Sequence, residues 1–448
     1  MGKLLDRSLI VNILFVCIIV GIFLFPTIHI SFSLPHFQLT DILLPFVTLF
    51  IPLEFVKRYS KKIIIFTGLP LFMVFISILF NLDKFSYNDL FEFYKILKIS
   101  VYILFFSSNF FEKCFINNTI NIVFVGVFVF NIFQYFNFFE FNNTLELLYA
   151  DSKHLIFFGK NTLGQPDTKR LLGTLGNPNN NSIGISFFFF YYLFSDQRNK
   201  YTKYLFINLS LLLILASQSR TGFYSVTLIF IYYVLVHCKT LNKKLIYIGF
   251  YILCFIIVSK LQEFETKISV TDSKNSIITL DKSHDVVKQM NDKNKVPKEI
   301  TDVSGTKYLS SVDFEDMDQN TSINSRLEIW KLLFKMIKEK PIFGHGPQKN
   351  FFYEKHLYPE NEYILNFWRY GLFGLIVYVL FYAIPIIGVF KKDKYTIDPN
   401  FYFFILLSIT AITNLPISEP RISILIAMSF GLLLNKYNKT NEEKVTFS

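Results

Sequence analysis

Long apolar stretches alternate with short polar segments along most of the chain. Each apolar stretch is roughly 17 to 25 residues long, the length with which an α-helix crosses a hydrocarbon layer of about 30 Å. The pattern therefore predicts an all-α polytopic membrane protein with about 12 transmembrane helices. The predicted spans are residues 9–30, 38–56, 63–81, 93–110, 116–137, 179–195, 203–217, 221–238, 245–261, 362–390, 401–416 and 421–436.

Two longer segments interrupt this pattern, at residues 138–178 and 262–361. They divide the chain into an N-terminal membrane bundle of about nine spans (1–261), a large loop (262–361), and about three C-terminal spans with a tail (362–448). The first half of the large loop, 266–321, mixes Lys, Asp, Asn and Ser and has too few apolar residues to bury a firm core.

The second half of the large loop contains a predicted amphipathic helix. Between Arg326 and Lys340, apolar side chains recur at helical spacing on one face, and charged side chains lie opposite them. The apolar set is Leu327, Trp330, Leu333, Phe334 and Ile337. We expect the helix to begin with a capping box formed by Ser325 and Glu328 and to end at Pro341.

The lysines of the chain gather in short loops between alternate spans. The 448 residues are 52% hydrophobic and carry a formal net charge of +11, which in a soluble protein would suggest nucleic-acid binding. Here the basic loops (57–62, 198–203, 239–244 and 391–394) act as topology signals instead, so no nucleic-acid partner is expected. By the positive-inside rule both termini are cytoplasmic, and the two long segments lie on the outer face. The four cysteines show no metal-binding spacing, and no disulfide framework is expected.

Five of the eight arginines oppose this topological bias, because they fall on the outer side or at the outer ends of spans. They are Arg170, Arg220, Arg326, Arg369 and Arg421. A guanidinium group is always charged and binds phosphate through paired hydrogen bonds, so several arginines at one level of the membrane would form an anion site. Each one alone could also extend along a span end or pair with an acid such as Glu419.

A series of short motifs runs through the second half of the chain. In order, they are Q-S-R-T-G at the start of a span, S-R-L-E-I-W, E-K-P-I-F-G-H-G-P, E-N-E-Y-I, and R-Y-G-L-F-G in the next span. The earlier segment R-L-L-G-T-L-G-N-P-N-N-N-S-I-G contains a G-x-x-x-N-P-N pattern. Together with the spans and the long outer loop, this order resembles the superfamily of Wzy-type O-antigen polymerases and O-antigen ligases over residues 173–390.

The resemblance implies a GT-C-like membrane glycosyltransferase with a large periplasmic loop, acting on undecaprenyl-diphosphate-linked oligosaccharides at the periplasmic face of the bacterial inner membrane. It implies no metal and no other cofactor. A polymerase transfers the growing glycan to a new lipid-linked repeat unit, and a chain-length regulator (polysaccharide co-polymerase) is a candidate partner of such an enzyme. A ligase transfers the glycan to the lipid A core. A flippase for the same lipid-linked units is the alternative from another class, although internal repeats are not evident.

The resemblance also assigns roles to single residues. Arg220 and Arg326 stand at the family's two arginine positions, where they would hold the diphosphate and neutralise charge as it leaves. The wider set of candidates for binding the diphosphate or the glycan is Arg170, Arg220, Arg326, Arg369, Arg421, Asn177, Asn179, His345 and His356.

Four glycines also match the family. Gly344 and Gly346 match its P-x-x-G-x-G turn, where a positive φ is expected. Gly371 and Gly374 match glycines of the next span, and we expect them to allow close helix packing.

Two carboxylates at the end of the large loop are candidates for the catalytic base. Ligases carry a His-Asn pair at this place, whereas the present chain has Glu360-Asn361 followed by Glu362, which favours a polymerase. The base must lie within about 3 Å of the attacking hydroxyl group. Beside arginines, either carboxylate suits a base or a structural ion pair, and both alternatives stay open. His345 and His356 lie near enough in the sequence to be kept as alternative bases.

Overall fold

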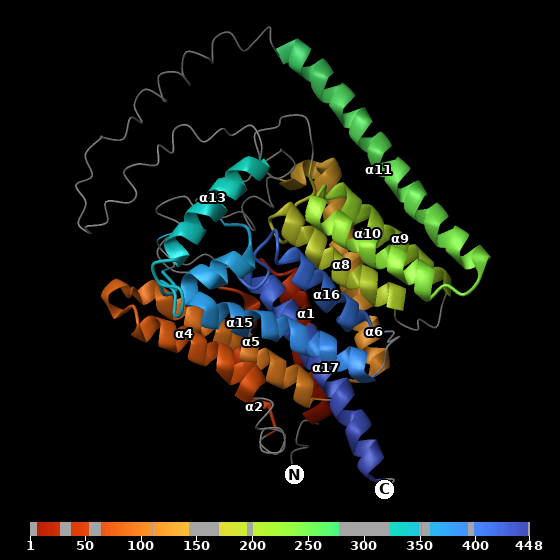
Figure 1. The fold of residues 1–448 in the computed structure, drawn as a ribbon. Helices are drawn as coiled ribbons and strands as arrows, with labels where there is room; N and C mark the ends of the chain where they lie inside the picture. Colours follow the sequence, from red (N-terminus) through yellow and green to blue (C-terminus); the bar gives the residue numbers. More distant parts are fainter. Residues whose placement is uncertain are drawn as a thin grey trace.

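The computed structural model describes residues 7–26, 37–52, 64–109, 111–142, 170–194, 200–276, 322–348, 351, 359–392 and 398–446. Figure 1 shows that these residues form a bundle of helices, which confirms the all-α class for the described part of the chain. The helices are α1 (Arg7–Phe23), α2 (Leu39–Leu49), α4 (Leu69–Leu79), α5 (Leu90–Ser108), α6 (Lys113–Phe136), α8 (Pro178–Phe194), α9 (Lys200–Ala216), α10 (Arg220–Val236), α11 (Leu241–Ser276), α13 (Ser322–Ile337), α15 (Glu362–Lys392), α16 (Pro399–Thr410) and α17 (Pro420–Thr446).

Several of these helices have the composition of membrane spans. Within the described residues, three are long and apolar enough to cross a membrane: Cys114–Phe136, Leu241–Leu261 and Glu362–Ile387. Shorter apolar helices are Arg7–Phe23, Leu39–Leu49, Leu69–Leu79, Arg220–Val236 and Pro399–Thr410. The architecture is that of an integral membrane protein, and the count of about 12 spans stays a prediction.

Helix α8 lies at the centre of the bundle, among α9, α10 and α16 (Figure 1). All of its residues from Asn181 to Phe194 are buried, as expected for a helix that is apolar around its whole circumference. Aromatic rings hold it in place: Phe188 packs on Phe23 of α1 with ring centroids 4.5 Å apart, and Phe194 stacks on Tyr402 of α16 at 3.8 Å. The position of the α8 N-terminus is therefore set by the core of the molecule.

Helix α13 differs from its expected boundaries. It begins at Ser322 and ends at Ile337, so Ser325 lies inside the helix and the expected capping box at its start is wrong. A capping box is a local pattern, and the residues before Ser325 adopt helical conformation as well, so the pattern did not mark the boundary. Residues 338 and 339 form a turn and residue 340 a bend, and a residue directly before a proline is disfavoured in helical conformation.

The apolar face that the sequence predicted for α13 is buried only in part. Trp330, Leu333 and Ile337 pack toward α15, in a small cluster with Trp368. Leu327 and Phe334, however, are 44% and 45% exposed.

Helix α15 is broken at Gly371, which has a φ of 65° and a ψ of −163°. The segment 341–346 fills the break. The amides of Leu372 and Phe373 donate to the carbonyl oxygens of Pro341 and Ile342, at 2.7 and 3.3 Å. In turn, the carbonyl oxygens of residues 368 and 369 accept from the amides of residues 345 and 346, at 3.0 and 2.9 Å. These are the groups that an unbroken helix would have paired with each other, so the backbone stays satisfied.

Gly371 and Gly344 make this insertion sterically feasible. A Cβ atom on Gly371 would lie 2.2 Å from the carbonyl oxygen of Ile342, and one on Gly344 would lie 2.4 Å from that of Arg369. The positive φ expected at Gly344 and Gly346 is confirmed, with values of 67° and 89°. The role expected for Gly371 was incomplete, because this residue breaks its helix as well as allowing close approach.

Candidate functional site

The loop between α16 and α17, residues 411–419, joins the N-terminal ends of three helices. Thr413 shares a hydrogen bond of 2.7 Å with Thr221 of α10. Asn414 accepts from the side-chain amide of Asn179 of α8 at 3.1 Å. The amide of Glu362, the first residue of α15, donates to the carbonyl oxygen of residue 411 at 2.9 Å. We call residues 411–419 the hub loop, because it brings together segments that are far apart in the sequence.

Arg220 is the first residue of α10, and its side chain is exposed. Ser219 caps this helix by accepting from the amide of Gly222 at 3.2 Å. Arg170 lies beside Arg220, and its Nε and Nη2 atoms donate to the carbonyl oxygens of Ser217 and Gln218 at 3.4 and 3.3 Å. Burial, together with the charge of Arg220, lowers the pKa of Arg170. Two guanidinium groups thus lie near enough to interact electrostatically at the positive end of a helix.

No acidic side chain within the described ranges forms an ion pair with Arg220. A pair of neighbouring cations at a helix N-terminus repels itself, and an anionic ligand would relieve that repulsion. This arrangement can therefore hold a phosphate group.

Asn177, directly before α8, and Asn179, in its first turn, form different hydrogen bonds. Asn177 is exposed, and its side-chain oxygen accepts from the amides of Asn179 and Asn180 at 2.8 and 3.4 Å, as an N-cap does. Both polar atoms of the Asn179 side chain form hydrogen bonds. Its nitrogen donates to Asn414, and its oxygen accepts from the hydroxyl group of Ser219 at 2.8 Å. Asn179 therefore ties the starts of α8 and α10 to the hub loop, while Asn177 faces solvent.

Arg421 is 3% exposed and donates to the carbonyl oxygen of Thr174 at 2.5 Å. Glu419 accepts from the side-chain amide of Asn180 at 3.1 Å. Burial raises the pKa of Glu419, and the neighbouring Arg421 partly offsets this effect. These contacts fasten the hub loop to the segment that precedes α8.

Arg326 of α13 forms an ion pair with Glu360. The two side chains are 30% and 41% exposed, so both remain open to solvent. The indole nitrogen of Trp330 donates to the carbonyl oxygen of Pro359 at 2.6 Å and holds the segment before Glu360 against α13. Glu360 itself has a φ of 44°, a left-handed conformation that costs a residue with a side chain roughly 1 to 2 kcal/mol.

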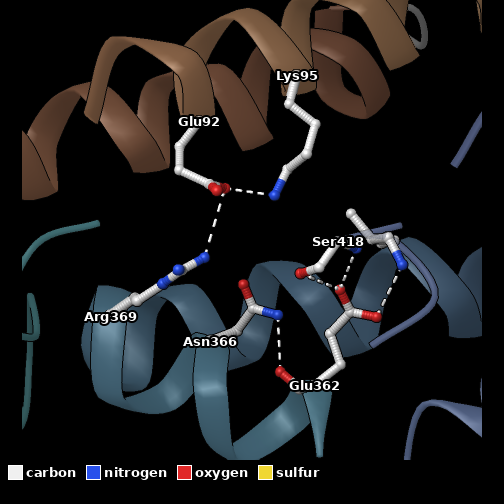
Figure 2. A network of polar contacts seen from close by, with 7 residues as sticks. Glu92, Lys95, Glu362, Asn366, Arg369 and Ser418 are labelled. Carbon is white, nitrogen blue, oxygen red and sulfur yellow. Dashed lines mark hydrogen bonds and ion pairs between the residues drawn. The ribbon is translucent and has the colours of Figure 1, made fainter. Parts of the chain in front are cut away.

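Glu362 has a different environment from Glu360. Its side chain is 1% exposed and accepts from the amides of Ile417 and Ser418 at 2.9 and 3.0 Å, and from the hydroxyl group of Ser418 at 3.3 Å. Figure 2 shows this carboxylate directed toward Ser418 of the hub loop. Three donors from one loop make Glu362 an anchor between α15 and the hub loop.

Arg369 points toward Glu92 of α5 (Figure 2). Its guanidinium group lies 3.4 Å from the carboxylate of Glu92, which also forms an ion pair with Lys95. The side chains of Arg369 and Glu92 are 9% and 8% exposed. Ionisable residues buried at this depth in an apolar bundle are costly unless they are paired, and this group is paired.

Sequence reasoning missed Glu92 and Lys95 as partners of Arg369. The signal was present, because Glu92, Lys95 and Lys98 interrupt an otherwise apolar stretch at the spacing of one helix face. The partners in the hub loop had no such signal, since Thr413 and Ser418 are ordinary loop residues by sequence.

His345 lies in the segment 341–346 and is 3% exposed. Its ring stacks on Trp368 with centroids 5.0 Å apart, and its Nε2 atom lies 2.9 Å from the carbonyl oxygen of Met336. Burial lowers the pKa of His345. The contacts of this histidine join α13 to α15, and His356 lies outside the described residues.

Residues 205–379 match the family model described as O-antigen ligase. This range contains Arg220, Arg326, Glu360, Glu362 and Arg369, whereas Arg170, Asn177, Asn179 and Arg421 lie outside it. No curated protein matches the chain. The family match agrees with the ordered motifs around Arg220, Arg326 and Gly344, so residues 205–379 are similar to the O-antigen ligase family and consistent with the ligase and polymerase superfamily.

Proposed function

We propose that the chain is a membrane glycosyltransferase that polymerises undecaprenyl-diphosphate-linked oligosaccharide repeat units. The family match supports an O-antigen ligase or polymerase type of function. The observation that carries the proposal is the pair formed by Arg220 and Arg170 at the start of α10, with no acidic partner for Arg220 among the described residues. Such a pair suits the diphosphate of a lipid carrier.

The proposed reaction is a single displacement at the anomeric carbon of the donor glycan. The bond between this carbon and the donor diphosphate breaks, and the hydroxyl oxygen of the acceptor unit forms the new glycosidic bond. The hydroxyl proton passes to Glu360, and the lipid diphosphate leaves with the bonding electron pair. Arg220 and Arg326 stabilise the charge that develops on the leaving group, an effect worth several kcal/mol for preorganised donors.

Glu360 is a better candidate for the base than Glu362. The carboxylate of Glu362 is 1% exposed and bound by three donors of the hub loop. Glu360 is 41% exposed, so an acceptor hydroxyl group can reach it. A base must approach the proton that it removes, and only Glu360 of the two is accessible in this way.

A polymerase accounts for this chain better than a ligase. The family model is described as O-antigen ligase, and the range that it matches contains Arg220 and Arg326. The carboxylate Glu360 stands where the ligase pattern has a histidine, and this difference favours the polymerase. We place the enzyme in the bacterial inner membrane, with both termini cytoplasmic, the site facing the periplasm, and a chain-length regulator as a candidate partner.

Transfer by the purified protein tests the proposal. Full-length protein in detergent is supplied with lipid-linked repeat units, and the products are separated by size. Wild type should produce a ladder of polymer, whereas Arg220→Ala and Arg326→Ala should each lower the rate by about 100-fold or more.

The matched control is Arg7→Ala, because Arg7 lies on α1, where its guanidinium group donates to the carbonyl oxygen of Phe50 at 3.3 Å and not to a residue of the proposed site. This variant should keep the wild-type rate. Normal ladders from Arg220→Ala would contradict the proposal. Polymer formed without a second compartment would exclude a flippase that only transports.

A further inference from the structure

Arg326 and Glu360 are the two proposed site residues that the structure pairs with each other. In this state the guanidinium group is occupied by a carboxylate that belongs to the protein. The Oε2 atom of Glu360 is likewise engaged by Arg326, so this oxygen does not accept a substrate proton while the ion pair is in place. The ion pair therefore describes a resting site in which both groups are blocked.

The backbone on either side of Glu360 is held in place. Pro359 is fixed by Trp330, as described above, and the side chain of Asn361 accepts from the amide of Ile364 at 3.0 Å to cap α15. Between these two fixed residues, Glu360 has its left-handed backbone conformation and a side chain that is 41% exposed. The side chain can change its direction without displacement of α13 or α15.

The neighbouring carboxylate does not take the place of Glu360 on Arg326. Glu362 accepts from Ile417 and Ser418 of the hub loop, and breaking these bonds would leave one buried and one partly buried amide unsatisfied. Once Glu360 leaves Arg326, the guanidinium group is thus open to an external anion. Phosphate and carboxylate groups bind a guanidinium group in the same paired geometry, so they compete for it.

We propose that Glu360 and the donor diphosphate bind the same guanidinium group of Arg326 in turn. When the diphosphate binds, it displaces the carboxylate of Glu360 and so releases it. This proposal rests on the proposed function and adds its regulation. The diphosphate carries more negative charge than one carboxylate and is also attracted by Arg220 and Arg170, so it binds Arg326 in preference to Glu360. The base becomes available only when a donor is bound, which couples proton acceptance to substrate binding.

Binding of inorganic pyrophosphate to the detergent-purified full chain tests the exchange. The variants are Glu360→Gln, Arg326→Gln and the double variant, and the dissociation constant is measured by calorimetry. Glu360→Gln should bind pyrophosphate about threefold to fivefold more tightly than wild type, the size expected when a partly exposed ion pair no longer competes. In the Arg326→Gln background, the same substitution should give no gain.

The double variant separates exchange from a general effect of charge. If Glu360 only adds negative potential to the site, its removal will improve binding equally with and without Arg326, and that result would overturn the proposal. Glu328→Gln is the matched control, because Glu328 is an exposed residue of the same helix. It should leave the dissociation constant within about twofold of wild type.

Other outcomes distinguish this inference from the proposed function. If Arg220→Gln and Arg326→Gln weaken pyrophosphate binding but Glu360→Gln binds like wild type, the exchange is wrong and the proposed function stands. If neither arginine variant weakens binding, or if pyrophosphate binds neither wild type nor Glu360→Gln, both are wrong. Glu360→Gly is a second variant, which relieves the left-handed backbone and should show the same gain in affinity.

Discussion

Glu360 and Glu362 lie two positions apart, and their carboxylates have opposite surroundings. The first is partly exposed and meets a guanidinium group, while the second is buried and accepts from three donors of the hub loop. Along the chain both were candidates for the base, because they lie two positions apart at the start of the same predicted span. Their environments assign the reactive role to Glu360 and the structural role to Glu362.

Substitution of each carboxylate by glutamine should separate these roles. Glu362→Gln turns one acceptor oxygen into an NH₂ group that faces N–H or O–H donors, so it should lower the free energy of unfolding by about 1 to 3 kcal/mol. Glu360→Gln should leave stability nearly unchanged and abolish transfer. Thermal unfolding in detergent and the transfer assay measure the two effects. Equal loss of stability in both variants would contradict the distinction.

Gly371 is the second position at which a single residue decides local structure. Gly371→Ala should destabilise the protein by more than about 2 kcal/mol, because the left-handed backbone is unfavourable for alanine and its Cβ would meet a carbonyl oxygen. Gly249→Ala is the matched control, since a Cβ at that position of α11 would meet nothing within 4 Å.

The control should be neutral or slightly stabilising, because alanine favours helix over glycine by about 0.5 to 1 kcal/mol. Midpoints of thermal unfolding compare the two variants. A Gly371→Ala protein as stable as Gly249→Ala would show that the segment 341–346 does not need the break in α15.

At the level of the element, α13 connects the proposed site to the membrane bundle. Its inner side chains pack on α15, its tryptophan holds Pro359, and its arginine pairs with Glu360. Helix α13, the segment 359–361 and the start of α15 thus form one structural unit. The position of Arg326 depends on how well α13 is packed.

Two leucines of α13 provide a test of this dependence. Leu333 is 0% exposed, so Leu333→Ala should leave a cavity and cost about 2 to 5 kcal/mol. Leu327 is 44% exposed, and Leu327→Ala should change stability by less than about 0.5 kcal/mol. Alanine suits a helix at both positions, so the comparison isolates packing.

Leu333→Ala should also slow transfer, because Arg326 and Glu360 would lose their common support. Unfolding midpoints and transfer rates are measured on the same preparations. If transfer by Leu333→Ala equals that of Leu327→Ala, α13 does not position the site.

For the whole molecule, the orientation in the membrane follows from the basic loops and stays a prediction. A reporter that is active only in the cytoplasm should work when fused after Ser448, and one that is active only in the periplasm should work when inserted near residue 300. Reversed activities would place the proposed site on the cytoplasmic face. They would thereby contradict transfer at the periplasmic side.

The pattern of the chain predicted its helices better than their ends and contacts. Apolar stretches mark segments that must hide their backbone polar groups in helices, so the all-α class followed directly from composition. Boundaries depend on neighbours, and α13 began earlier and ended earlier than its capping signals indicated. The positive φ of Gly344 and Gly346 was predictable because the P-x-x-G-x-G turn needs a residue without a side chain.

By itself, then, the sequence determined that this is a helical protein with apolar stretches long enough for membrane spans, and it contained the ordered motifs that resemble the O-antigen ligase and polymerase superfamily. The tertiary structure alone decided the partners of the charged side chains. Arg326 pairs with Glu360, Arg369 pairs with Glu92, and Glu362 accepts hydrogen bonds from the hub loop. The reason is physical. Local patterns specify backbone conformation, whereas ion pairs between distant residues depend on the packing of whole helices, which no short stretch of sequence encodes.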